Sequence, residues 1–447
     1  MRVLLMSFFA VLLTFGGLSA NPSSKGFFPY QYETLTLDNG FTALLIPMKG
    51  SGLVAYYTIV RTGSRDEWEA GKSGFAHFFE HMMFRGTEKY SADDYEHMLT
   101  DMGANNNAYT TDDYTCYYMV IPGDRIDTAL DMESDRFQNL SYEEGPFRTE
   151  AGAVYGEFRK NRTNPWSVAY EEISNLAFDK HTYKHTTMGF EADIKEMPNG
   201  YEYSKSFFQR YYRPENCILL IAGDFEVAET SKKIESFYGD WKSGYVKPQI
   251  VAEPEQTGER SKEVIYEGKT LPLIWIAYKS AAFDADNKMI AAASLLGNLA
   301  FGQNSDIYKQ LVIREQKVQF IGGSFGFNRD PKFYSIRTMV KNEDDLGYVQ
   351  EQIDKTIEHF KTEPVSEAEL NKLKKRNRYS YLMGLDTPNQ VASNLARMIA
   401  LNGSNGIEAV NQLYAAYDDI TPEDIRAAAK HFLQNDRRTI ITLKGDR

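Results

Sequence analysis

The sequence carries one succession of elements twice, and this repetition constrains the fold more than any other feature. Residues 203–224 are predicted to form a helix, a short loop and a buried strand that ends in a Gly-Asp pair at 223–224. Residues 421–446 show the same order and end in a Gly-Asp pair at 445–446, which lies 222 positions further along a chain of 447 residues. A chain of this length is long enough for two or more domains. We therefore expect two halves with a shared plan.

A stretch rich in proline and acidic residues separates the two halves. It covers residues 247–258, and its composition is typical of a linker. Each half alternates predicted strands with longer helical stretches, which indicates an α+β fold in which helices pack on a sheet. We therefore predict an N-terminal domain over residues 28–245, a linker over 246–262 and a C-terminal domain over 263–447.

The first twenty residues have the pattern of a secretory signal peptide. Arg2 supplies a positive charge, residues 3–15 are mostly apolar, and residues 16–20 form a cleavage region of mainly small side chains. The apolar run is too short and too broken by glycine to favour a stable membrane anchor. An organellar transit peptide, the alternative, would be richer in Arg and Ser. We expect residues 1–20 to direct secretion, with the periplasm as the preferred compartment.

The acidic composition excludes some partners. The formal net charge is −12, so we do not expect the chain to bind nucleic acid or anionic lipid through a general electrostatic field. The acidity would favour basic peptides, although it is also what keeps many secreted proteins soluble.

The chain has two cysteines, Cys116 and Cys217, and both fall in predicted strands of the first half. They do not form a C-x-x-C pair, which argues against a thiolate metal site or a redox motif. Whether they form a disulfide in an oxidising compartment is open at this point.

The first half contains the sequence His77-Phe-Phe-Glu80-His81. On an α-helix, residues three and four apart share a face, so two imidazoles and a carboxylate can point to one place. Two neutral imidazoles suit zinc, and a nearby carboxylate can take a proton from a zinc-bound water. The order H-x-x-E-H is the reverse of the commoner H-E-x-x-H and is the inverzincin pattern. We predict a zinc site here, with a helix that carries two chance histidines as the alternative.

A catalytic zinc usually has three protein ligands, so a third must come from elsewhere in the chain. Glu150 and Glu157 lie seven residues apart, about two turns of a helix, and can face the same way. One interpretation of this pair is an exposed acidic helix face. The other is that Glu157 completes a His-His-Glu set, while Glu150 orients one of the ligands.

Together these motifs resemble the pitrilysin/insulinase family of metallopeptidases, in its half-length bacterial form similar to the beta subunit of the mitochondrial processing peptidase. In that family a ligand glutamate follows H-x-x-E-H by about 76 residues, and a second acidic residue lies two turns before it. Glu157 lies 76 positions after His81. The resemblance implies one zinc ion per chain, bound by His77, His81 and Glu157. It also implies Glu80 as the catalytic general base and Glu150 as the supporting carboxylate.

The resemblance also implies a fold and a way to hold substrate. It implies two similar domains from one duplication, each a mainly antiparallel sheet covered by helices. A turn rich in Gly and Asn followed by a strand pattern, over residues 103–118, indicates by itself a buried hairpin. It resembles a family segment whose edge strand pairs with an extended peptide, so Asn107 and Ala108 would contact the substrate. We therefore expect a zinc endopeptidase that cleaves unfolded or short peptides inside a closed chamber.

One departure from the family pattern concerns the partner. Family members of this size commonly work as pairs, in which one subunit holds zinc and the other supplies an Arg and a Tyr, seven positions apart, to stabilise the oxyanion. Arg314 is present here, but Ile321 stands at the tyrosine position and Phe320 cannot donate a hydrogen bond. We hypothesise a heterodimer in which a second related subunit supplies the Arg/Tyr pair. A homodimer is the runner-up.

The remaining histidines do not suggest a second metal site. His359 and His431, in the second half, do not belong to an H-x-x-E-H sequence. His97, His181 and His185 lack a helical ligand partner. We therefore expect one metal site in the chain.

Two other functions are compatible with parts of this pattern. Some relatives of the fold are structural subunits of respiratory complexes, so one alternative is a non-catalytic core or assembly subunit. A scaffold has no physical need for the set His77, Glu80, His81 and Glu157, which argues against this function. The other alternative is a metal-dependent hydrolase of non-peptide substrates, which the peptide-pairing strand disfavours.

Overall fold

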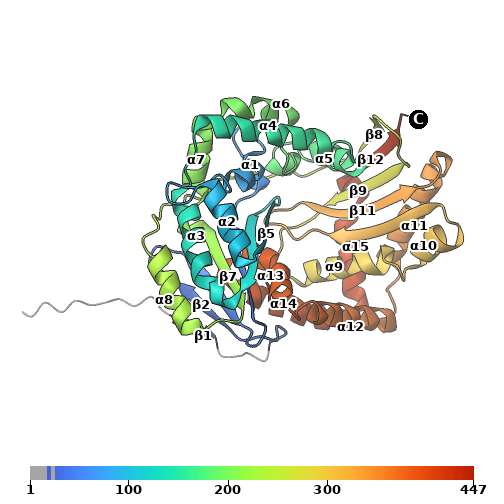
Figure 1. Cartoon of the computed structure of the whole chain (residues 1–447). Coiled ribbons are helices and arrows are strands. Elements are labelled where there is room, and N and C mark those ends of the chain that lie inside the picture. Colours follow the sequence, from blue (N-terminus) through green and yellow to red (C-terminus); the bar gives the residue numbers. More distant parts are fainter. Residues whose placement is uncertain (1–17, 22–25, 447) are drawn as a thin grey trace, which may run out of the picture.

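The computed structural model describes residues 18–21 and 26–446, which form two β-sheets with helices packed on them (Figure 1). The first sheet has seven strands in the order β1-β2-β3-β7-β4-β6-β5. Of the predicted signal peptide, only Leu18–Ala20 fall within the described residues, in β1, and the rest lies outside them. The bounds of these strands are β1 Leu18–Asn21, β2 Tyr32–Thr36, β3 Thr42–Pro47, β4 Leu53–Val60, β5 Asn105–Thr110, β6 Thr115–Pro122 and β7 Cys217–Gly223.

The second sheet repeats the topology of the first. Its order is β10-β11-β9-β12-β8, which is the order β5-β6-β4-β7-β3 with five added to each strand number. In the first sheet only β3 and β7 are parallel, and in the second only β8 and β12. The prediction of two similar, mainly antiparallel domains is therefore confirmed. The bounds are β8 Arg260–Tyr266, β9 Leu273–Lys279, β10 Val318–Phe325, β11 Phe333–Val340 and β12 Arg438–Gly445.

The two Gly-Asp pairs of the sequence repeat perform the same task in each sheet. Each pair ends a central strand, β7 or β12. The Asp224 carboxylate accepts a hydrogen bond from the Gly50 N–H at 2.9 Å, and Asp446 accepts one from the Gly268 N–H at 3.1 Å. A Cβ atom on Gly223 would lie 2.2 Å from a backbone carbonyl of β4, so no larger residue fits there. The repeat thus ties each central strand to the loop that follows its parallel neighbour.

Fifteen α-helices lie within the described residues, and none of them is long and apolar enough to cross a bilayer. Their bounds are α1 Phe75–Met82, α2 Ala92–Met102, α3 Ile126–Asn139, α4 Glu144–Asn161, α5 Pro165–Ala177, α6 Glu191–Glu196, α7 Tyr201–Tyr211, α8 Val227–Tyr238, α9 Lys288–Phe301, α10 Asp306–Tyr308, α11 Leu346–Thr362, α12 Glu367–Met383, α13 Pro388–Asn402, α14 Gly406–Asp419 and α15 Pro422–Phe432.

Each sheet is covered on one face by helices of its own half and on the other by helices of the opposite half. The first sheet packs against α1, α3, α4, α7 and α8 on one face and against α13 and α14 on the other. The second sheet packs against α9, α11, α12 and α15 on one face and against α5 on the other, where Figure 1 shows α5 beside β8 and β12. Of the three crossing helices, α5 and α13 begin with proline, which suits a first helical turn. Neither half therefore buries both faces of its sheet without the other.

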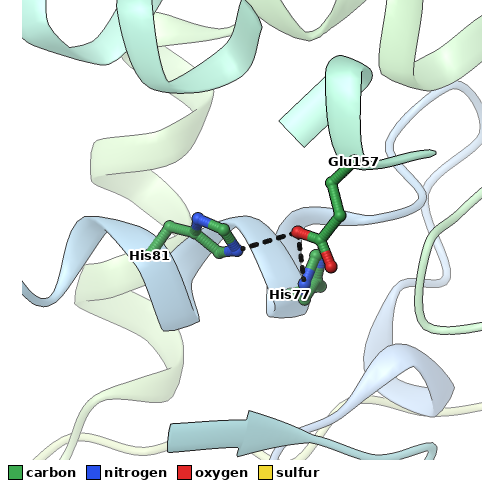
Figure 2. Close-up of side chains that lie close together, drawn as sticks. All are labelled: His77, His81 and Glu157. Atoms are coloured by element: carbon green, nitrogen blue, oxygen red, sulfur yellow. Dashed lines mark ion pairs between the residues drawn. The ribbon is translucent and has the colours of Figure 1, made fainter. Parts of the chain in front are cut away.

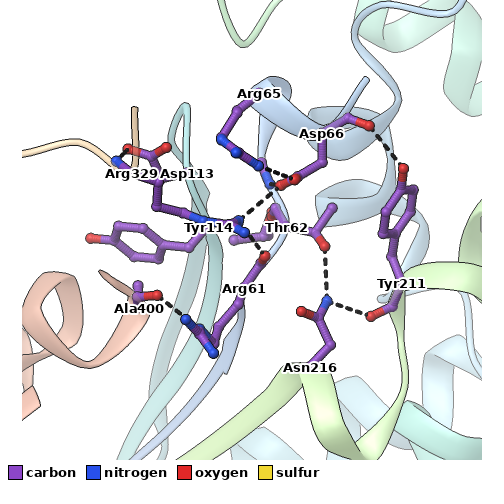
Figure 3. A network of polar contacts seen from close by, with 12 residues as sticks. Arg61, Thr62, Arg65, Asp66, Asp113, Tyr114, Tyr211, Asn216, Arg329 and Ala400 are labelled. Atoms are coloured by element: carbon purple, nitrogen blue, oxygen red, sulfur yellow. Dashed lines mark hydrogen bonds and ion pairs between the residues drawn. The ribbon is translucent and has the colours of Figure 1, made fainter. Parts of the chain in front are cut away.

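The turn between β10 and β11 joins the halves through buried polar contacts. Figure 3 shows Arg329 beside Asp66, at 3.3 Å, and Arg65 beside the same carboxylate, at 2.9 Å. Next to them, Asp330 lies 2.5 Å from Arg65 and 2.9 Å from His181. Burial opposes ionisation of Asp330, but hydrogen bonds from His181 and Arg65 outweigh it and hold the pKa of this carboxyl well below its usual range. This stabilisation is fully present above the unfolded pKa of about 3.9 and is lost only as the pH falls through the lower folded value.

The two cysteines do not form a disulfide. Cys116 on β6 and Cys217 on β7 are both buried and free. Their strands flank β4 on its two sides, and their side chains belong to cores on opposite faces of the sheet. This placement prevents the two sulfur atoms from meeting without movement of the backbone.

Candidate metal centre

Helix α1 presents the H-x-x-E-H side chains on one face because its other face is apolar. The apolar residues recur at helical spacing and are buried in the core of the first half: Phe75, Phe78, Phe79 and Met82. Their burial turns His77 and His81 toward α4, as Figure 2 shows. The sequence-predicted helix therefore exists, and the core sets its rotation.

Glu67 holds the start of α1, and sequence analysis missed it. Its two carboxylate oxygens accept hydrogen bonds from the N–H groups of Gly74, at 2.7 Å, and Ala76, at 2.6 Å. These N–H groups have no partner inside the helix, and the positive end of the helix dipole attracts a carboxylate. Glu67 belongs to no motif, so no signal in the sequence marks it. Its contacts fix the position of the helix that carries the histidines.

Helix α4 brings Glu157 to the two histidines. Its apolar stripe is buried against the same core and comprises Phe147, Ala151, Val154 and Phe158. The Glu157 Oε2 atom lies 3.7 Å from His77 Nε2 and 3.4 Å from His81 Nε2 (Figure 2). Ligand atoms of the three residues all lie within 4.8 Å of one another. Two ligand atoms bound to one tetrahedral zinc at about 2.1 Å would be about 3.4 Å apart, so this set fits a zinc ion.

The protonation of the histidines also suits a metal. Burial, with a smaller effect of the neighbouring His81, lowers the pKa of His77 to about 3, so its imidazole is neutral at physiological pH. His81 Nδ1 lies 2.8 Å from Glu150 Oε1, a contact that keeps a proton on Nδ1 and leaves Nε2 free to bind. Arg85 pairs with the other oxygen of Glu150. The sequence did not predict this role of Arg85. Glu150 thus lies one contact away from the three-residue set.

Glu80 lies beside this set and is held by Thr110, a third residue that the sequence did not predict. The Thr110 hydroxyl donates a hydrogen bond to Glu80 Oε2 at 2.7 Å. Burial raises the pKa of Glu80, and the charge of Glu157 adds to this, while the hydrogen bond from Thr110 opposes it. Thr110 lies two residues after Ala108, within the strand pattern that resembles a family segment. This pattern is the one signal in the sequence that could have identified Thr110.

Strand β5 forms the free edge of the first sheet beside Glu80. Within the described residues it pairs with β6 alone, so its other edge has no strand partner. Asn107 on this strand is exposed, and Ala108 is buried. The Ala108 N–H donates to the side chain of Asn107 at 2.9 Å, and Thr110 of the same strand contacts Glu80. Asn107 and Ala108 therefore lie on the edge that leads to the candidate catalytic carboxylate.

The other histidines lie apart from this group. His181 contacts Asp330 at the junction of the halves, and His185 lies 3.6 Å from Glu67. His359 and His431 belong to α11 and α15 of the second half. Across residues 18–21 and 26–446, the one group of three or more ligand-type residues close enough to share an ion is that of His77, His81 and Glu157.

Two family models match the chain. Residues 53–191 match insulinase (peptidase family M16), and residues 201–377 match the peptidase M16 inactive domain. The first match contains all of the candidate zinc ligands, and the second covers much of the half without them.

Related proteins and solved structures agree with these matches. Zinc protease PqqE of Helicobacter pylori is 26% identical over 435 residues, 96% of both chains. Mitochondrial-processing peptidase subunit beta of Blastocladiella emersonii is 23% identical over 420 residues, 92% of this chain and 88% of that protein. A protease structure from Helicobacter pylori has a TM-score of 0.87 at 24% identity, over 93% of this chain and 100% of that chain. The periplasmic protease PqqL from Escherichia coli has a TM-score of 0.77 at 18% identity, over 95% of this chain and 48% of that chain.

Proposed function

The chain belongs to the insulinase family of peptidases (M16), and we propose that it is a secreted zinc endopeptidase that cleaves unfolded or short peptides. The observation that carries the proposal is the convergence of His77, His81 and Glu157 beside Glu80. A family relationship alone would not suffice, because one fold hosts many functions and the chemistry lies in the site.

The three ligand atoms fit a catalytic zinc rather than a structural one, since a structural site would close around the ion with a fourth protein ligand. When bound, zinc supplies a Lewis acid that polarises the scissile carbonyl and acidifies a water molecule. His77 is ready to bind because burial keeps its imidazole neutral. Glu150 orients His81 through Nδ1, so the two imidazoles and Glu157 face one point.

Glu80 carries the proton in this mechanism. As a carboxylate it accepts a proton from the attacking water, and as a carboxylic acid it donates that proton to the departing amine nitrogen. The rise in the pKa of Glu80 caused by burial brings it closer to neutrality, which suits a group that must accept and then donate. The hydroxyl of Thr110 holds one carboxylate oxygen, so the side chain keeps its orientation through both steps.

The free edge of β5 supports a peptide as the substrate. An extended peptide can add to this edge as a further strand, and backbone hydrogen bonds then hold it without regard to its sequence. Because such pairing requires an extended chain, we expect the substrates to be unfolded or short peptides, held in a closed chamber. The hydrogen bond from the Ala108 N–H to the side chain of Asn107 would give way to a substrate carbonyl.

We test this function with Glu80→Gln, which keeps the size of the side chain and removes its basicity. Cleavage of an unfolded peptide should fall by about 10³-fold in kcat/KM, while the zinc content stays at the wild-type value. The matched control is Glu88→Gln, an exposed glutamate between α1 and α2, which should change neither quantity. A Glu80→Gln variant that cleaves normally would contradict the mechanism. Zinc-loaded wild type that cleaves no peptide, alone or with related chains, would favour the assembly-subunit function.

We further propose that the active enzyme contains a second related subunit. Arg314 is exposed at the end of a π-helical turn, Lys309–Arg314. Ile321 is buried in the core of the second half, and the ring of Phe320 packs 5.5 Å from that of Trp166. Neither residue offers a hydroxyl to a substrate oxyanion. A heterodimer would place the missing Arg/Tyr pair opposite the zinc site, and a homodimer is the less favoured alternative.

The partner is tested by reconstitution. The purified chain is assayed alone and with each related chain of the same organism that has the Arg/Tyr pair and lacks H-x-x-E-H. We expect activity to rise at least tenfold with one such chain, and the two to co-elute at a mass of one copy of each. Full activity of the isolated chain would reject the heterodimer, and an active complex with the mass of two identical chains would show a homodimer.

We propose the periplasm as the location of the mature protein. The charged, apolar and small-residue regions of residues 1–20 support export, and the structurally similar PqqL is described as a periplasmic protease. Fractionation of a Gram-negative host should place the full-length chain in the periplasm and a variant without residues 2–20 in the cytoplasm. Equal distribution of the two forms would contradict this.

A further inference from the structure

A cavity of about 500 Å³ lies between the two halves, and none of the candidate zinc ligands lines it. Its walls come from the turn Thr111–Tyr114 between β5 and β6, the start of α5, the face of the second sheet that α5 partly covers, and the turn between β10 and β11. Arg397 of α13 also lines it. The mechanism proposed above does not use this space.

One wall of the cavity is aromatic. Tyr170 of α5 stacks on Trp275 of β9, with ring centroids 5.5 Å apart and planes 12° from parallel. Trp166, also of α5, lies 6.1 Å from Trp275. Such a wall offers a flat apolar surface to the carbon atoms of a ligand.

Two arginines line the same cavity, and within the described residues neither forms an ion pair. The guanidinium carbon of Arg337, on β11, lies 5.2 Å from the centre of the Trp275 ring, which fixes its direction but does not neutralise it. Arg397 contacts the backbone carbonyl of Phe327, at 3.5 Å, and the side chain of Tyr114, neither of which carries a negative charge. Both arginines keep their charge at any physiological pH.

The acidic residues of the cavity, by contrast, are already occupied. Asp112 pairs with the buried Lys332 at 2.5 Å. Asp113 accepts hydrogen bonds from the Tyr183 hydroxyl at 2.6 Å and from Asn328 at 2.8 Å. The cavity therefore has an excess of positive charge in a protein whose net charge is −12. Guanidinium groups that lack an acidic partner and line a cavity favour an anionic ligand.

The cavity also lies on the path of a peptide along β5. Thr110, the last residue of β5, contacts Glu80, and Thr111, the next residue, lines the cavity. A strand advances by about 3.3 Å per residue. A peptide that pairs with β5 and continues past Thr110 would enter the cavity within a few residues of the bond that Glu80 serves.

We propose that this cavity binds a carboxylate of the peptide substrate, with the carboxylate at Arg337 and Arg397 and the adjoining carbon atoms on the aromatic wall. The carboxylate belongs either to an Asp or Glu side chain near the cleaved bond or to the free C-terminus of the peptide. This inference rests on the proposed peptidase function and assigns a charge preference to it.

The test measures binding and cleavage of matched peptides. One pair differs by Glu against Gln, with both C-termini amidated, and is made with the residue at each of several positions. A second pair has the Gln sequence with a free or an amidated C-terminus. Binding is measured by calorimetry to Glu80→Gln, which does not consume the peptide. We expect the anionic member of one pair to bind about tenfold more tightly, and the pair that responds identifies the source of the carboxylate.

The arginines are then changed in the same background. Arg337→Gln and Arg397→Gln should each reduce the tenfold preference to about twofold, and Arg337→Lys should keep part of it. Arg125→Gln, an exposed arginine at the far end of β6, is the matched control and should keep all of it. Melting temperatures establish that each variant is folded. Equal binding within both pairs would overturn the proposal, as would a preference that survives in a folded variant that combines Arg337→Gln with Arg397→Gln.

Cleavage by the wild type separates this inference from the function on which it rests. If the wild type, with any subunit it requires, cleaves neutral and anionic peptides at equal rates, the cavity assignment fails and the peptidase function stands. If no peptide is cleaved, the proposed function fails, while the binding preference still decides what the cavity holds.

Discussion

The helix that follows β4 and the helix that follows β9 stand at matching places in the two halves, yet they carry different chemistry. Both α1 and α9 pack beside the edge strand of their sheet, β5 or β10. Helix α1 carries His77, Glu80 and His81 on the side away from the core, whereas α9 is apolar over most of its length and largely buried. The fold thus provides the position, and the side chains provide the chemistry.

The space between helix and edge strand differs in the same way. In the second half, a Cβ on Gly297 of α9 would lie 2.4 Å from the carbonyl oxygen of Gly323 on β10, so backbone meets backbone. In the first half, the side chains of Glu80 and Thr110 fill the corresponding gap. The close packing in the second half leaves no room for ligands, whereas the gap in the first half holds the carboxylate that we propose as the general base.

The largest expected effect is the loss of zinc when a histidine of the first half, but not one of the second half, is replaced. We expect His81→Ala to lose its zinc and its activity, because two ligands remain of three. His359→Ala, on α11 of the second half, should keep one zinc per chain and full activity. Zinc content by mass spectrometry after dialysis measures both. Metal loss from His359→Ala would show that the second half takes part in the site.

A smaller effect should follow from Glu150→Gln, since this residue orients His81 without being a ligand. We expect zinc affinity to fall about ten- to a hundredfold while the fold is kept. Competition with a chelator measures the affinity. The control is Glu144→Gln, an exposed glutamate on the same helix that pairs with Arg148. Equal affinity in both variants would show that Glu150 only packs.

The smallest effect concerns protonation of the metal-free protein. Because burial lowers the pKa of His77 to about 3, its imidazole should stay neutral from pH 8 down to about pH 4. Nitrogen NMR of the imidazole side chains, with His77→Gln for assignment, follows this directly. A midpoint near 6.5, the ordinary value for histidine, would show that His77 is solvated and that the site is more open than its contacts indicate.

The sequence predicted those features that have a local period or a fixed spacing. The paired imidazoles, the glutamates two turns apart and the repeated Gly-Asp pairs each leave such a pattern, and the structure brings all of them to the predicted places. The packing of α5 and α13 on the sheet of the opposite half left no such pattern in the sequence. An apolar helix face shows that a helix is buried but not which sheet buries it.

The supporting contacts of the site were missed for a related reason. Glu67, Arg85 and Thr110 act through partners to which no spacing rule connects them. The cavity with its two arginines is formed by elements from both halves, so its members become neighbours only in the folded chain. Features of this kind require coordinates because they depend on long-range packing.

The central claim is that His77, His81 and Glu157 bind one zinc ion. Zinc content combined with X-ray absorption at the zinc edge tests it most directly, on the wild type and on Glu157→Ala. We expect one zinc per wild-type chain, with imidazole nitrogens at about 2.0–2.1 Å, and loss of the ion from Glu157→Ala. A zinc-equilibrated wild type that binds no ion, or a Glu157→Ala variant with unchanged zinc content and spectrum, would contradict the account.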